Sequence, residues 1–211
     1  MSNFAFCQTK ISDFLKFYFA IIGVGSSIIA SEINFFQNED NSNKDWVIYM
    51  MTIANVSSLF LMCSIVASGY LHIEWLKTKL IVTPIDNLYN TGMYKWMIIE
   101  VLLCAVMNYP SLYGVDYTET AIPTAGTPYV LNDFMLCLMI FIRLPYLLRL
   151  ILMLSDYQQP RAQRVCSIYG CDANNLFSLK CVMKESSHKV VFFALIISTI
   201  TFSYNLRLFE R

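Results

Sequence analysis

The stretch Val47–Leu71 runs for 25 residues without a single charged side chain. A helix needs about 20 mainly apolar residues to cross the roughly 30 Å hydrocarbon core of a bilayer. Within lipid, a single segment of that length satisfies its own backbone hydrogen bonds only as a helix. Four further stretches reach or approach this length: Phe14–Ile33, Gly92–Tyr109, Tyr129–Leu154 and Val190–Leu208. The sequence therefore predicts an all-α membrane protein with five transmembrane helices.

The composition predicts that the chain lies in a lipid bilayer, and it argues against nucleic-acid binding and enzyme activity. Of the 211 residues, 56% are hydrophobic and 14% are charged, whereas soluble domains carry about 25% charged residues. The net charge of zero leaves no basic face for nucleic acid. The chain has two histidines, His72 and His188, and no recognisable nucleophile–base pair. An enzyme is therefore the least favoured class, and we expect no cofactor in this chain.

The distribution of basic residues predicts the orientation. Cytoplasmic loops of membrane proteins are enriched in Lys and Arg. The segment between the third and fourth apolar stretches, Pro110–Pro128, has neither residue, and Asn34–Trp46 has one lysine against three acids. The other two connections are rich in basic residues: Lys77, Lys79, Lys95, Arg161, Arg164, Lys180, Lys184 and Lys189. We expect a cytoplasmic N-terminus and an extracellular C-terminus.

The seven cysteines fit that orientation without disulfides. Three lie in predicted spans, and four fall on the predicted cytoplasmic side, where thiols stay reduced: Cys7, Cys166, Cys171 and Cys181. Cys166, Cys171, Cys181 and His188 lack the short paired spacings of structural zinc sites. We expect free thiols and no metal.

Five ionisable residues lie at or near membrane depth, and they are the candidate intramembrane charge network: Arg143, Arg149, Glu100, Glu32 and Asp133. An arginine at the centre of a spanning helix costs about 2.5–3.5 kcal/mol, so a partner is expected. For Arg143 the choice is between a static ion pair with Glu100 and a moving gating charge. Arg149 either pairs functionally or extends to the inner headgroups. Glu32 and Asp133 lie near outer helix ends, where simple solvent exposure is expected.

Two arginines six residues apart are too sparse for a strong voltage sensor. They lie about 9 Å apart along a helix, and Pro145 stands between them. A proline inside a helix removes a backbone hydrogen bond, so we expect a kink there. Any voltage response should be shallow.

The segment Ser155–Lys189 is long for a connection between packed spans and should hold structure of its own. Pro160 can begin a helix, Gly170 can end it, and Leu176–Glu185 predicts a second short helix. The first of these helices carries the candidate calmodulin-contacting residues, apolar and basic side chains together: Arg161, Arg164, Val165, Ile168 and Tyr169. Such a pattern suits a partner of the calmodulin type or, more simply, an amphipathic linker on the inner leaflet.

Several short motifs, in the same order and spacing, resemble small-conductance calcium-activated potassium channels. They are Glu100-Val101-Leu102-Leu103-Cys104-Ala105, Phe141-Ile142-Arg143-Leu144 with Arg149, Val182-Met183-Lys184, and Glu210-Arg211. The similarity covers the first five membrane helices of that family, from Glu32 to Arg211. It departs from the family at Pro145 and by a few extra residues between Arg164 and Phe177.

The resemblance implies a four-helix voltage-sensor-like bundle over residues 1–154, a cytoplasmic helical linker over 155–189 and the first pore-domain helix over 190–211. It also implies a homotetramer in the plasma or ciliary membrane that conducts potassium ions when complete. Calcium would act through calmodulin on the linker. The family's Gly-Tyr-Gly filter does not occur in this sequence. We therefore expect a truncated channel subunit.

Two other hypotheses for the function stay open. A pore-less, sensor-like membrane protein could assemble with full-length subunits and regulate them. A transporter or membrane enzyme would need more polar groups converging at the membrane midplane than this sequence provides.

Overall fold

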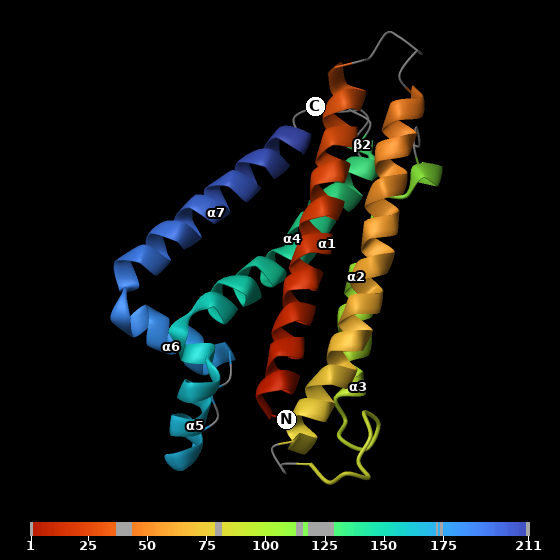
Figure 1. Cartoon of the computed structure of the whole chain (residues 1–211). Helices are drawn as coiled ribbons and strands as arrows, with labels where there is room; N and C mark the ends of the chain where they lie inside the picture. Colours follow the sequence, from red (N-terminus) through yellow and green to blue (C-terminus); the bar gives the residue numbers. More distant parts are fainter. Residues whose placement is uncertain are drawn as a thin grey trace.

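The computed structural model describes residues 2–36, 44–78, 82–112, 116–117, 129–171, 173 and 175–209. The fold is built from helices (Figure 1). The longer ones are α1 (Ser2–Phe36), α2 (Lys44–Thr78), α3 (Tyr94–Cys104), α4 (Leu131–Leu154) and α7 (Ser187–Phe209). Short helices are η2 (Pro110–Leu112), η3 (Asp156–Gln158), α5 (Pro160–Ile168) and α6 (Asn175–Glu185). The two-residue strands β1 (Asp116–Tyr117) and β2 (Tyr129–Val130) pair antiparallel.

Four helices are long and apolar enough to cross a bilayer, namely α1, α2, α4 and α7. They cover four of the five predicted spans, and they fit a protein embedded in a membrane. The third predicted span, Gly92–Tyr109, contains only the 11-residue helix α3, which is about 16 Å long. A fifth crossing therefore stays a prediction.

Local chemistry explains why α3 is short. Gly92 adopts φ +70°, a left-handed conformation outside the right-handed helix. At the other end, α3 stops at Cys104 with Ala105 as its C-cap. Backbone turns at Ala105 and Val106, which bond back to Leu102 and Leu103, finish the helix. The helix is therefore shorter than the predicted span at both ends.

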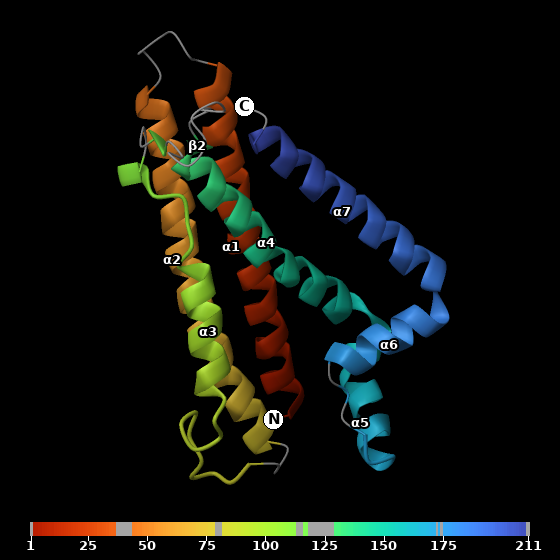
Figure 2. The ribbon, with the colours of Figure 1, turned by 180° about the vertical axis from the view of Figure 1, so that it is seen from behind.

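Helices α1 and α2 pack antiparallel along most of their length, α4 crosses α1, and α3 lies against α2 (Figures 1 and 2). We call these four helices the α1–α4 core. Small residues at the contacts, such as Ala20, Ala30 and Ala54, are almost completely buried. Small side chains let helix backbones approach closely where lipid offers no hydrophobic driving force. One buried cluster joins Ala20, Leu61, Ile65, Cys104 and Tyr146.

Helix α7 slants away from the α1–α4 core and meets it near the C-terminal end of α7 (Figure 2). There Leu208 packs with Leu136 and Ile140 of α4, and the rings of Phe141 and Phe202 lie 5.6 Å apart. Only 6% of the apolar window of α7 is buried, against 33–39% in the other three long helices. Most of α7 therefore faces lipid or another protein.

The connection between α4 and α7 contains short helices, as predicted. α5 begins at Pro160, and α6 covers the second predicted helix with one extra residue at its start. Gly170, with φ +70°, follows α5, and the Cys171 amide donates to the Cys166 carbonyl at 2.9 Å. This is the Schellman pattern that ends helices at glycine. We call residues 155–186 the connector; residues 172 and 174 lie outside the described part.

Candidate functional site

Arg143 lies inside the α1–α4 core, with 4% of its surface exposed. Its Nη2 donates to the Ser58 hydroxyl of α2, and its Nη1 donates to the Ala20 carbonyl of α1 at 3.5 Å. In the described part of the chain, no carboxylate pairs with Arg143. Neutral oxygen atoms on two neighbouring helices therefore hold this guanidinium.

A glycine makes room for the guanidinium. A Cβ atom placed on Gly23 of α1 would overlap Arg143 Nη1 and would lie 2.7 Å from the Ser57 hydroxyl oxygen. The two serines of α2 turn their hydroxyl protons back to the helix, because Ser57 and Ser58 each donate to the Ala54 carbonyl at 2.8 and 2.7 Å. The oxygen of Ser58 is thereby left to accept from Arg143.

Glu100 pairs with Arg149 and not with Arg143. Arg149 Nη1 lies 3.0 Å from Glu100 Oε1, so the static Arg143–Glu100 ion pair, one of the two alternatives for Arg143, is wrong. The cause is the register of two antiparallel helices. Cys104 Sγ of α3 lies 3.2 Å from the Tyr146 hydroxyl of α4. Because the two helices run in opposite directions, the residue one turn before Cys104 faces the residue one turn after Tyr146. These residues are Glu100 and Arg149.

The Arg149–Glu100 pair differs from the Arg143 site in its exposure. The side chains of Arg149 and Glu100 are 43% and 28% exposed. Helix α4 continues through Pro145 between the two arginines. Arg143 therefore occupies a closed site, whereas Arg149 occupies an open one at the edge of the α1–α4 core.

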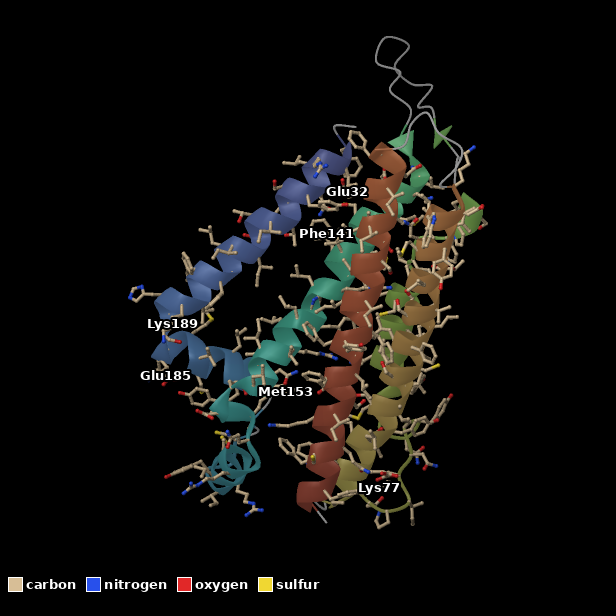
Figure 3. The ribbon with its side chains drawn as sticks, turned by 45° about the horizontal axis from the view of Figure 1, so that its top comes forward. Glu32, Lys77, Phe141, Met153, Glu185 and Lys189 are labelled. Carbon is tan, nitrogen blue, oxygen red and sulfur yellow. The ribbon has the colours of Figure 1, made fainter. Side chains whose placement is uncertain are left out.

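The two acids near the other end of the α1–α4 core are not simply solvated. Glu32 of α1 pairs with Arg207 of α7 at 3.0 Å, and Figure 3 shows Glu32 facing the C-terminal end of α7. Asp133 accepts a hydrogen bond from Ser31 at 3.3 Å. The Arg143 site, the Arg149–Glu100 pair and the contacts of Glu32 and Asp133 therefore lie at different places along the α1–α4 core.

Sequence reasoning missed a buried lysine. Lys16, near the start of the first predicted span, is 4% exposed, donates to Ser68 of α2 at 2.8 Å and pairs with Asp13 at 2.5 Å. The Asp13–Lys16 spacing of three residues, which puts both side chains on one helix face, was the available signal. Arg207 was also missed, although it is the basic residue in the last turn of α7.

The candidate calmodulin-contacting residues lie on α5 and just after it, and all are exposed. Val165, Ile168 and Tyr169 have 49%, 81% and 79% of their surface exposed. Their spacing puts them on one helix face, and Arg161 and Arg164 are exposed on the same helix. An uncovered apolar face with flanking cations is what a groove-forming partner recognises.

Side-chain hydrogen bonds join two elements of the connector, η3 and α6. The Tyr157 hydroxyl of η3 donates to Glu185 at the end of α6, at 2.7 Å, and Gln158 donates to Asn175 at the start of α6. The hydrogen bond to Glu185 raises the pKa of Tyr157 above its ordinary value. These bonds set η3 and α6 side by side beneath the end of α4.

Over the described residues, no group of three or more His, Cys, Asp or Glu side chains could hold a metal ion. Cys166, Cys171 and Cys181 are free cysteines. No protein-family model matches this sequence, and no curated protein matches it.

Proposed function

We propose that these residues form the sensor-like and linker parts of a calcium-activated, calmodulin-gated potassium channel subunit. The connector carries the proposal, because it sets an exposed, partly basic helix, α5, between the membrane-length helices α4 and α7. A protein that binds α5 and displaces it can move α7 through α6. In this proposal, α1 to α4 form the sensor-like bundle, α7 is the first pore-domain helix, and four subunits surround the pore.

Arg143 supports a static role for α4 in this proposal. Its contacts reach α1 and α2 together, so a sliding movement of α4 would break both and leave a cation in a closed apolar site. Gating through the connector needs no such movement. The potassium filter and calmodulin-binding helices of the complete subunit would come from residues outside these 211.

Orientation follows from the same proposal. Lys77, the connector and the N-terminus lie on the cytoplasmic side, where calmodulin is found, and the Glu32–Arg207 pair lies near the outer face. The α3 region crosses the membrane in this topology with a short helix and a non-helical remainder, which is tolerated where backbone is covered by protein.

The test is a calmodulin titration of the full 211-residue chain in detergent, with and without calcium. We expect calcium-dependent binding that Arg161→Glu with Arg164→Glu weakens at least tenfold. Lys77→Glu with Lys180→Glu reverses the same number of charges outside α5 and should bind within about twofold of wild type. Absence of calcium-dependent binding, or equal loss in both double variants, would contradict the proposal.

A further inference from the structure

A cavity of about 610 Å³ opens at the end of the α1–α4 core where α1 begins and α2 ends. Its walls come from α1, α2, α3 and α4, and also from η3 and α6 of the connector. Met153, labelled in Figure 3, lines it from α4. The volume is in the range of ordinary small-molecule sites.

The charged lining of this cavity carries one excess positive charge. Its cations are Lys10, Lys16 and Arg149, and its carboxylates are Asp13 and Glu100, which gives 3 − 2 = +1. Asp13 pairs with Lys16, and Glu100 pairs with Arg149. Lys10 lies over the Phe6 ring at 5.1 Å, and among described residues no carboxylate pairs with it. Lys10 is therefore the cation available to a ligand.

Aromatic side chains in the lining are typical of the depth of lipid headgroups. Trp75 and Trp96 line the cavity, and tryptophan is enriched at the membrane–water interface. Lys77 lies beyond Trp75 in the last turn of α2. Basic pockets between membrane helices on the cytoplasmic side hold anionic headgroups. A metal cation fits poorly, because both carboxylates already pair with cations.

We propose that this cavity binds the phosphate-bearing headgroup of an anionic membrane lipid. Lys10 carries the excess positive charge and bonds the phosphate, while Lys16 and Arg149 stay paired with Asp13 and Glu100 in the cavity wall. Because η3 and α6 line the same cavity, the bound headgroup also contacts the connector and steadies it against the α1–α4 core. This binding does not require the chain to belong to a potassium channel.

Tryptophan fluorescence of the full chain in detergent micelles provides the test. Two of the three tryptophans line the cavity, and Trp46 lies about 40 Å away along α2. In a Trp46→Phe background, titration with short-chain phosphatidylinositol bisphosphate should give a saturable change in emission. Lys10→Gln should weaken this binding about fivefold, the effect of one basic residue near anionic lipid.

Two further variants separate the cavity from general charge attraction. Arg161→Gln on exposed α5 removes the same charge outside the cavity and should leave the affinity within twofold. Thr9→Phe adds bulk to the lining without changing charge and should also weaken binding, with unchanged thermal unfolding showing that it folds. Equal weakening by Lys10→Gln and Arg161→Gln would overturn the proposal, as would no binding to wild type.

A second arm identifies the source of the phosphate. Soluble inositol trisphosphate that binds with the same dependence on Lys10 assigns the site to a free headgroup in water, which overturns the lipid assignment. Binding of the lipid alone confirms it. Either result is independent of calmodulin binding, so this test and the test of the proposed channel role can fail separately.

Discussion

Gly23 of α1 lies where any side chain would overlap the guanidinium of Arg143 on α4. The residue that allows the arginine is thus 120 positions before it in the sequence. Because the arginine bonds to neutral oxygens of Ala20 and Ser58, its site depends on close helix approach and not on an opposing charge. The geometry of α1 therefore controls whether α4 can carry a buried cation.

Gly23→Ala should destabilise the protein by about 1–3 kcal/mol, since the added methyl group must push Arg143 or the helices apart. It should do so although alanine favours a helix by about 1 kcal/mol over glycine. Gly25→Ala is the matched control, because an added Cβ there meets nothing within 4 Å. Thermal unfolding in detergent measures both variants. Equal stability of the two would contradict the predicted overlap.

Arg143→Gln should cost about 1–3 kcal/mol, because it removes donors to two buried oxygens. Combined with Gly23→Ala, the loss should be smaller than the sum, since the shortened side chain leaves room for the methyl group. In a complete channel we expect Arg143→Gln to reduce surface expression more than it changes the steepness of voltage dependence. Normal surface expression with a large change in steepness would contradict this.

The Arg149–Glu100 pair should contribute far less. Both side chains are substantially exposed, and exposed ion pairs contribute about 0–1 kcal/mol. A double-mutant cycle with Arg149→Gln and Glu100→Gln should therefore give a coupling energy below about 1 kcal/mol that falls as salt is added. A coupling of several kcal/mol, unaffected by salt, would show that the pair is buried in the membrane.

The long helices and the connector were predictable because their signals are local. Twenty apolar residues predict a spanning helix without knowledge of any neighbour, and Pro160 and Gly170 mark the ends of α5 by their backbone preferences alone. The start of α3 had a similar signal in Gly92, two residues before it. The predicted span includes Gly92 because apolar length alone does not exclude a glycine from a spanning helix.

The contacts of the charged residues were not predictable in the same way. Which acid faces Arg149 depends on the register between α3 and α4, fixed by packing around Cys104 and Tyr146. Glu32 and Arg207 are 175 positions apart, so their pairing requires the placement of α7. The sequence gives no indication that a serine hydroxyl and a backbone carbonyl are the partners of Arg143, because both groups occur throughout apolar helices.

The Tyr157–Glu185 bond should make the connector sensitive to alkaline pH. The folded protein holds the pKa of Tyr157 above its ordinary value, so the bond stabilises the connector below pH about 10 and is lost as pH rises through the folded pKa. The difference between the ultraviolet titration curves of the wild type and of Tyr157→Phe isolates the ionisation of the Tyr157 hydroxyl. Glu185→Gln should lower its midpoint, and an unchanged midpoint would show that the carboxylate has no influence on Tyr157.

The cysteines provide a test of the proposed topology. Cys7 in α1 and Cys171 after α5 are exposed, whereas Cys104 and Cys137 are buried. With N-terminus and connector both cytoplasmic, a membrane-impermeant maleimide should label Cys7 and Cys171 in inside-out vesicles and leave them unlabelled in right-side-out vesicles. Single Cys7→Ser and Cys171→Ser variants identify each site. Labelling of one cysteine from each side would place an odd number of membrane crossings between them and would exclude four crossings by the α1–α4 core.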